Sequence, residues 1–353
     1  MFMACCFRVK VETSKHNVVG REEEVSSGLS YKAASSFVPL TSRTEDEVLR
    51  SNNLTCFTIN EVRAATRNFH PDSMIGKGGF GCVFKGWIDE HTLAPTKQGT
   101  GFAVSVKRLN DKSNQGHSEW LTEINYLGQL HHPNLVKLIG YCIEDECWIL
   151  VYEFLTKGSL DNLLFKRASN FQPLTWKIRM KIALDVAKGL AFLHSDEVNV
   201  IHGNLKTSKI LIDSNHNAKL YNFGLAKDIP EIDMIDPDMV YIQGPYDAPE
   251  YKLIGHLTKK SDVYGFGVVL LEIMSGKRAL DYNRPRWEND LVVWARPLLI
   301  NKEKIYQVMD SCIEGQYSPH EAMEVARIAI QCLSCNSKNR PNIDDVVRSL
   351  EKL

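Results

Sequence analysis

The sequence predicts an α+β protein with two lobes, a smaller strand-rich lobe followed by a larger helical one. Residues 102–107 are β-branched and alternating, as expected of a strand. Residues 178–193 carry an apolar stripe at helical spacing, and helical patterns continue to the C-terminus. With 353 residues, 44% of them hydrophobic, the chain can bury a large core. Two lobes of this kind predict a cleft between them.

Residues 1 to about 56 differ in composition from the rest of the chain. They contain Ser/Thr-rich and charged stretches, including Glu22–Glu24, and no sustained apolar period. Such segments bury too little apolar surface to offset the entropy that folding costs. We therefore expect residues 1–56 to be a mostly disordered tail and residues 57–353 to be the folded domain.

The first lobe is expected to begin with a short helix and then a series of strands. Thr58 and Glu61 have the spacing of a capping box, which predicts a helix start. Residues 74–110 are predicted to form strands around a glycine cluster. One helix follows, with an apolar face made of Trp120, Ile124, Leu127 and Leu130. After it, strands are predicted at residues 135–139 and 148–154.

The pattern becomes helical after about residue 155. One apolar stripe is formed by Ile178, Ile182, Val186, Leu190 and Leu193. Ser318 and Glu321 have capping-box spacing around an N1 proline, which predicts a second helix start. Asn342 is expected to cap a last helix that runs to Leu353.

Composition excludes several classes of protein. The chain has 42 Lys and Arg residues and 43 Asp and Glu residues, which gives a net charge of −1. It is therefore not a broadly basic protein, and we expect no nucleic-acid partner. The longest apolar stretches, 148–155 and 268–274, are far shorter than the ~20 residues of a membrane span. The N-terminus lacks the long apolar core of a signal peptide. The nine cysteines lack zinc-ligand spacing, so we expect a reducing cytoplasmic compartment and no structural metal.

A glycine motif lies between two predicted strands. Gly76, Gly78 and Gly81 form G-x-G-x-x-G, and glycines let backbone N–H groups approach phosphate oxygens. The motif alone is weak evidence for a nucleotide site, and a glycine-rich hairpin is the alternative. A dinucleotide-binding fold would need a helix directly after the motif, whereas residues 83–85 predict a strand.

A lysine and a carboxylate follow at suggestive positions. Lys107 ends the β-branched segment, and Glu123 lies on the predicted helix beyond it. A strand lysine held by a helix carboxylate is the arrangement with which protein kinases bind the α- and β-phosphates of ATP. The alternative for a single lysine is a solvated strand end.

Together with further motifs, these residues make the chain resemble a protein kinase, specifically a plant receptor-like cytoplasmic kinase. The motifs are the glycine loop, Lys107, Glu123, Leu150–Phe154, Gly189–His194, Ile201–Lys206, Asn222–Gly224, Ala248–Glu250, Ser261–Tyr264 and Arg340–Pro341. In order and spacing they are jointly very specific. The resemblance implies a bilobal protein-kinase-like fold, with an N-lobe at about residues 69–152 and a C-lobe at about 156–353.

The resemblance also implies roles for individual residues. The nucleotide-binding positions are Ile75, Gly76, Gly78, Gly81, Val83, Ser105, Lys107, Glu123, Tyr152, Glu153 and Leu211. Lys206 is the retained lysine of the catalytic loop. Glu250 is expected to pair with Arg340, and Asp262 to brace the catalytic loop, so these three residues are interpreted as scaffold.

Three positions that carry chemistry in this family are substituted. In the family's H-R-D-L-K-x-x-N loop the aspartate accepts the substrate hydroxyl proton, but this chain has Asn204, an amide that cannot hold a proton near neutral pH. Lys209 replaces the metal-binding asparagine of the loop, and Asn222 replaces the metal-binding aspartate of D-F-G. Gly203 replaces the arginine that receives an activation-loop phosphate. No intact catalytic set and no metal site are therefore expected.

These losses have a predictable size. A positioned general base is worth roughly 10²–10⁴ in rate, and metal ions supply much of the charge stabilisation in phosphoryl transfer. Each substitution also makes the site more positive. We hypothesise that Lys209 stands in for the missing cation, so that ATP binding is weak or magnesium-independent; the alternative is that Lys209 points into solvent. Ser105 replaces the alanine that the family usually has above the adenine ring. Its hydroxyl either narrows the adenine pocket on that side or forms a local hydrogen bond.

The segment between Gly224 and Ala248 contains no Ser or Thr, although related kinases are phosphorylated there. Its only hydroxyl groups belong to Tyr241 and Tyr246, and the sequence does not show whether either is phosphorylated. Its acidic residues include Asp228, Glu231, Asp233, Asp236 and Asp238. One hypothesis is permanent mimicry of phosphate, and the alternative is a solvated loop. In either case Ser/Thr switching is not expected.

The N-terminus bears on location. Relatives commonly begin Met-Gly and are myristoylated, but Phe2 replaces that glycine. Cys5 and Cys6, beside basic residues, are candidates for palmitoylation, and two acyl chains would anchor the protein peripherally to the plasma membrane. The alternative is that they are unmodified cysteines of a cytoplasmic protein.

The expected function is that of a catalytically inactive Ser/Thr kinase homologue, a pseudokinase. By resemblance it would act as a regulatory or decoy partner of other kinases, receptor kinases or pathogen effectors in plant receptor and defence signalling. The alternative is a weakly active or atypical Ser/Thr kinase that uses ATP through Lys107 and Lys206. A third alternative is a product under relaxed constraint without a partner.

Overall fold

The computed structural model describes most of the chain after residue 36. The described residues are 37–39, 43–51, 53–78, 81–109, 114–144, 147–165, 172–228, 244–255 and 257–353. The expectations for Cys5 and Cys6, for Tyr241 and for the acidic residues at 231–238 lie outside these ranges.

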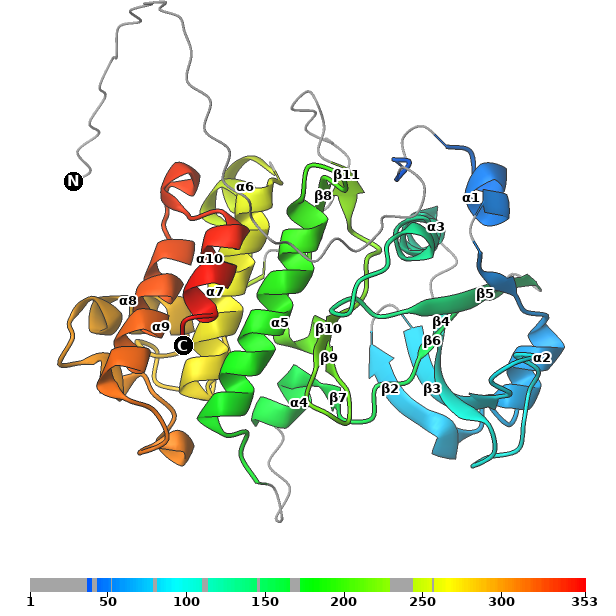
Figure 1. The fold of residues 1–353 in the computed structure, drawn as a ribbon, viewed down its shortest axis with the longest axis horizontal. Helices are drawn as coiled ribbons and strands as arrows, with labels where there is room; N and C mark the ends of the chain where they lie inside the picture. Colours follow the sequence, from blue (N-terminus) through cyan, green and yellow to red (C-terminus); the bar gives the residue numbers. More distant parts are fainter. Residues whose placement is uncertain are drawn as a thin grey trace, which may run out of the picture. The chain divides into compact units, whose positions relative to one another are not determined.

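The N-terminal lobe is built on a six-stranded sheet with the strand order β1-β5-β6-β4-β3-β2 (Figure 1). The strands are β1 (Thr55–Cys56), β2 (Met74–Gly78), β3 (Gly81–Ile88), β4 (Phe102–Leu109), β5 (Leu138–Glu144) and β6 (Cys147–Glu153). Only the β1–β5 pairing within this sheet is parallel. The strands predicted within residues 74–110 are confirmed.

Alternate residues of β6 pack on opposite sides of the sheet. Leu150 and Tyr152 join the larger core with helix α3 (Asn114–Gln129), whereas Ile149 and Val151 join a smaller core with helix α2 (Ile59–Ala65). Successive side chains of a strand point to opposite faces, so a strand covered on both faces is apolar throughout. This explains why residues 148–154 show no polar alternation.

One predicted strand begins too early. Residues 135–139 are apolar apart from Lys137, but the regular strand β5 starts only at Leu138. Before it, Leu135 forms an isolated bridge with Leu220, and the Val136 N–H donates to the Leu220 carbonyl (2.9 Å). Leu135 and Val136 are buried where the two lobes meet, and burial alone does not distinguish a connecting segment from a strand.

Ordered structure extends upstream of the expected start at Phe57. Helix α1 (Glu45–Ser51) and strand β1 lie in the region assigned to the tail, and Phe37–Leu353 form one contact unit. Val48 of α1 is fully buried in the larger core. Its helix has seven residues, so it shows too few apolar positions to give a periodic signal. The capping box of α2 at Thr58 and Glu61 is confirmed.

The C-terminal lobe is mainly helical, and α5, α7, α9 and α10 pack against one another in it (Figure 1). Its helices are α4 (Leu160–Phe165), α5 (Trp176–His194), α6 (Pro249–Ile254), α7 (Lys259–Ser275), α8 (Leu291–Ile300), α9 (Pro319–Cys332) and α10 (Ile343–Leu350). Short strands are β7 (Gly158–Ser159), β8 (Val200–Ile201), β9 (Ile210–Ile212), β10 (Ala218–Leu220) and β11 (Lys227–Asp228). The 3₁₀ helices are η2 (Pro71–Ser73, in the first lobe), η3 (Thr207–Lys209), η4 (Ile305–Gln307), η5 (Ser311–Ile313) and η6 (Ser337–Asn339).

The helical expectations hold in this lobe. The predicted stripe on α5 is buried except for the half-buried Ile178. Capping boxes at Ser318 and Asn342 begin α9 and α10, although α10 ends at Leu350 rather than Leu353. The predicted α+β architecture of two lobes is therefore confirmed. Among the described residues, no helix is long and apolar enough to span a bilayer.

Candidate active site

The glycine motif lies in a β-hairpin. Strands β2 and β3 are antiparallel, and Gly78 pairs with Gly81; the two residues between them lie outside the described ranges. Gly81 has φ +145°, and a Cβ there would lie 2.2 Å from the Arg108 carbonyl oxygen, so only glycine fits. Ile75 is half exposed and Val83 is half-buried. A strand rather than a helix follows the motif, which excludes the dinucleotide-binding arrangement.

Lys107 and Glu123 form the predicted pair in the interior. The Lys107 ammonium donates to Glu123 Oε2 (2.9 Å) and to Asn222 Oδ1 (3.1 Å). The other Glu123 oxygen accepts from the Phe223 N–H (3.3 Å). Burial, the largest single effect, lowers the pKa of Lys107, but interactions with Glu123, Tyr221 and Glu119 together outweigh burial and raise that pKa above its usual value. Lys107 is therefore charged and already has two partners.

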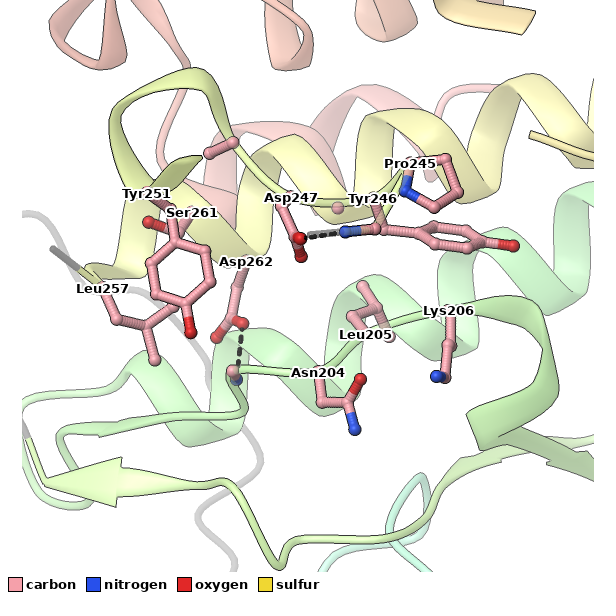
Figure 2. Close-up of a pocket in the computed structure, with 14 residues that line it drawn as sticks. Asn204, Leu205, Lys206, Pro245, Tyr246, Asp247, Tyr251, Leu257, Ser261 and Asp262 are labelled. Atoms are coloured by element: carbon pink, nitrogen blue, oxygen red, sulfur yellow. Dashed lines mark hydrogen bonds between the residues drawn. The ribbon is translucent and has the colours of Figure 1, made fainter. Parts of the chain in front are cut away.

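The catalytic loop is braced by Asp262 at the start of α7. Its carboxylate accepts from the backbone N–H groups of His202 (2.8 Å) and Gly203 (2.9 Å), and lies 2.9 Å from His194 Nε2. Figure 2 shows Asp262 reaching the loop backbone, with the side chains of Asn204 and Lys206 on the other side of that backbone. The loop thus keeps its support, while an amide occupies the proton-acceptor position.

Lys209 is held beside Tyr221. The Tyr221 N–H donates to the Lys209 carbonyl (3.0 Å), and Lys209 Nζ lies 5.6 Å from the centre of the Tyr221 ring. Burial, followed by repulsion from Lys107 and Lys206, lowers the pKa of Lys209 to about 7. These contacts argue against the alternative in which Lys209 simply extends into solvent.

The residues at the two metal positions do not fit magnesium. Magnesium prefers carboxylate and other oxygen ligands in octahedral geometry. Here Asn222 Oδ1 accepts a hydrogen bond from the Lys107 ammonium, and Lys209 brings an amine rather than an oxygen. Among the described residues, no group of three or more His, Cys, Asp or Glu side chains is arranged to hold a metal ion. We therefore derive no step through magnesium.

The other expected nucleotide positions have mixed surroundings. Ser105 lies opposite Tyr152 in the β4–β6 ladder, and the Tyr152 ring packs edge-on against Tyr221 (5.5 Å between ring centres). The Glu153 carboxylate accepts a hydrogen bond from Lys219 Nζ (2.7 Å), so this side chain already has a partner. The backbone N–H of Glu153 donates to the Lys137 carbonyl. The half-buried Leu211 lies on β9, two residues beyond Lys209.

The expected scaffold pair is present in the C-terminal lobe. Arg340 Nη1 and Nη2 donate to the two oxygens of Glu250 (2.6 and 2.7 Å), and Arg340 Nε donates to the Ser334 carbonyl (2.8 Å). The Arg340 side chain has no exposed surface. A buried, bidentate pair of this kind fixes α6 to the segment before α10.

A hydrogen-bond network that sequence reasoning missed surrounds Glu272. Glu272 Oε2 accepts from Tyr246 Oη (2.8 Å) and Thr207 Oγ1 (2.9 Å), and Oε1 accepts from the Ala279 N–H (2.7 Å). Burial raises the pKa of Glu272 to about 7. The Tyr246 hydroxyl, considered above as a phosphorylation candidate, is thus engaged with a buried carboxylate. No local sequence pattern joins residues 207, 246 and 272.

A cavity of about 160 Å³ lined by both polar and apolar residues lies beside the catalytic loop (Figure 2). Its walls come from the catalytic loop, the segment before α6 and the start of α7: Gly203–Lys206, Gly244–Ala248, Tyr251, Leu257, Ser261, Asp262 and Gly265. Asp247 contributes a carboxylate whose pKa burial raises. Of the acidic residues between Gly224 and Ala248, Asp228 accepts from Tyr126 Oη of α3 (3.1 Å).

Comparisons with known proteins place this geometry in context. Residues 69–350 match the family described as "Protein tyrosine and serine/threonine kinase". Receptor-like cytoplasmic kinase 176 of Oryza sativa subsp. japonica is 55% identical, with 99% of this chain and 90% of the relative covered. Serine/threonine-protein kinase BIK1 of Arabidopsis thaliana is 54% identical, with 99% and 89% covered. Probable serine/threonine-protein kinase PBL10 of Arabidopsis thaliana is 56% identical, with 94% and 80% covered.

These names bear on the two expected functions. The relatives are named as kinases, which favours the alternative of Ser/Thr kinase activity over the expectation of an inactive homologue. The inactive interpretation depends on positions 204, 209 and 222 of this chain alone.

Proposed function

Because the chain belongs to the protein tyrosine and serine/threonine kinase family, as a plant receptor-like cytoplasmic kinase, we propose that it is a regulatory kinase-fold protein with little or no metal-dependent phosphoryl transfer. The observation that carries this proposal is the hydrogen bond from Lys107 to Asn222 (3.1 Å). It ties the phosphate-binding lysine to a neutral amide at the position where the family has a metal-binding aspartate.

Two further substitutions support the proposal. Asn204 cannot act as a general base near neutral pH, and Lys209 adds a cation where a metal ligand is expected. Residues of a catalytic set act as a unit, so the combined loss need not be the sum of single losses. A positively charged site without a metal ligand supports weak or magnesium-independent ATP binding.

Partners follow from family membership rather than from a contact surface. We propose other kinases, receptor kinases or pathogen effectors, within plant receptor and defence signalling. The name of one relative, receptor-like cytoplasmic kinase 176, supports a cytoplasmic location. Palmitoylation of Cys5 and Cys6 would add peripheral attachment to the plasma membrane, and labelling with a palmitate analogue that persists in a Cys5→Ser/Cys6→Ser variant would contradict it.

Ser/Thr kinase activity is the second candidate function. The Lys107–Glu123 pair is intact at 2.9 Å, and relatives 54–56% identical are named kinases. This candidate needs a route that depends on neither a carboxylate at position 204 nor magnesium at positions 209 and 222. It predicts phosphate transfer that disappears in Lys107→Ala.

A transfer assay separates the two candidates. The purified full chain is compared with Lys107→Ala and with the triple variant Asn204→Asp/Lys209→Asn/Asn222→Asp, using radiolabelled ATP and magnesium. We expect the wild-type rate to match Lys107→Ala and the triple variant to exceed both by roughly 10²-fold or more, because a base and metal ligands return. A wild-type rate well above that of Lys107→Ala would favour the kinase.

A further inference from the structure

Two lysine side chains lie against one aromatic ring. Lys107 Nζ is 5.5 Å and Lys209 Nζ is 5.6 Å from the centre of the Tyr221 ring. Lys107 comes from β4, and Lys209 ends η3, so the sheet and the catalytic loop each supply one cation. A backbone hydrogen bond, from the Tyr221 N–H to the Lys209 carbonyl, holds these two residues side by side.

Among the described residues, three lysines and two carboxylates interact around this ring. Lys107 and Lys206 act on Lys209 electrostatically, as do the carboxylates of Glu123 and Glu119. Glu123 already accepts from Lys107 and from the Phe223 N–H. Like charges in a poorly solvated site repel each other. An anion bound between the lysines is attracted to both and offsets their mutual repulsion.

We propose that this site binds the phosphates of a nucleotide as the metal-free anion, with Lys107 and Lys209 supplying the positive charge. The inference rests on the proposed function, since a nucleotide held without magnesium lacks the ion that stabilises phosphoryl transfer. The ligand of the regulatory protein is then a nucleoside triphosphate that is not complexed with a divalent cation.

Magnesium is then a competitor rather than a cofactor. A divalent cation neutralises part of the charge on the phosphates, so the two lysines attract the remaining, less negative complex more weakly. Adding magnesium in excess over ATP therefore weakens binding. Replacing Lys209 by the family's asparagine removes one of the two cations and with it the preference for the metal-free anion.

Calorimetric titration of the full chain tests this inference. ATP is titrated once with a chelator and once with excess magnesium, and adenosine serves as the probe without phosphates. We expect metal-free ATP to bind at least about tenfold more tightly than the magnesium complex, equivalent to about 1.4 kcal/mol. Lys209→Asn should abolish this difference. Lys302→Asn, which removes an exposed lysine from the loop after α8, should retain it.

The outcomes separate this inference from the proposed function. ATP binding that requires magnesium, a Lys209→Asn variant that keeps the metal-free preference, or no ATP binding at all would each overturn the metal-free site. None of these results alters the transfer assay, which tests the proposed function separately. Thermal unfolding of each variant without ligand shows whether it is folded.

Discussion

Asn222 shows how one substitution keeps a shape while it changes the chemistry. Its φ of +68° lies in the left-handed region, which Asn and Asp tolerate better than most other residues. An asparagine can therefore occupy this backbone position, and its Oδ1 still accepts from Lys107 at 3.1 Å. What it lacks is the negative charge of the aspartate that the family has at this position.

Gly203 also occupies a position with a demanding backbone. Its φ is +73°, and a Cβ would lie 2.7 Å from the Leu225 carbonyl oxygen and 3.0 Å from Leu257 Cδ2. We expect Gly203→Ala to reduce the free energy of unfolding by about 1–2 kcal/mol, because a left-handed residue with a side chain is strained. Urea denaturation measures the change.

Gly78→Ala provides a matched control for that experiment. A Cβ at Gly78 would meet no atom within 4 Å. If both variants lose the same stability, strain at Gly203 is not the cause. If Gly203→Ala is as stable as the wild type, the loop accommodates a side chain there.

At the scale of elements, a buried carboxylate joins three parts of the C-terminal lobe. Glu272 of α7 accepts hydrogen bonds from Thr207 of η3 and from Tyr246 in the segment before α6. Tyr246, which also lines the cavity beside the catalytic loop, is thus connected to α7. A change at Glu272 should therefore be felt in the loop as well as in the helix.

The stability contributed by Glu272 should depend on pH. In the folded protein its pKa is about 7, above the ordinary value of 4.5, because burial disfavours the charged form. Between these values the folded state binds more protons than the unfolded state, so the free energy of unfolding falls as pH rises. The contribution is fully present below pH 4.5 and is lost as pH rises through 7. The slope is at most about 1.4 kcal/mol per pH unit.

Glu272→Gln removes this titration. Relative to the variant, the wild type should lose stability when urea unfolding is measured at pH 8 instead of pH 5. Glu314→Gln, at an exposed site, serves as the control for loss of one carboxylate and should follow the wild type. A wild type and a Glu272→Gln variant with parallel pH profiles would show that Glu272 does not titrate in this range.

At the scale of the whole molecule, the folded unit is larger than the kinase match. The family match begins at residue 69, but α1 packs on α3, and Arg43 Nη1 donates to Asn125 Oδ1 of α3 (2.7 Å). Helix α3 also supplies Glu123, so the N-terminal extension contacts the element that positions Lys107.

Val48→Ala tests whether this extension is part of the cooperative fold. Val48 is fully buried, and we expect the variant to lose roughly 1–3 kcal/mol of stability through lost burial and a small cavity. Val38→Ala, at a site 39% exposed, should change stability by less than about 0.5 kcal/mol. Equal, negligible effects would indicate that α1 unfolds independently of the domain.

Local patterns predicted most helices and strands because they depend on neighbours in sequence. Capping residues at Thr58, Ser318 and Asn342 act within one turn, and each begins a helix as expected. The strand at residues 135–139 was displaced because burial there comes from packing between the lobes. Helix α1 was not predicted, because Val48 is buried only through packing of α1 against the larger core.

By itself, the sequence determined the chemical inventory of the site: an amide at 204, an amine at 209 and an amide at 222, in a chain with the motif order of a kinase. The identity of each residue follows from the covalent structure of the chain and does not depend on folding. Only the tertiary structure shows that Lys107 donates a hydrogen bond to Asn222 and that Lys209 lies beside Tyr221. It also shows that Tyr246 and Thr207 both donate hydrogen bonds to Glu272. Such contacts join residues far apart in the chain, so they depend on packing that no local pattern records.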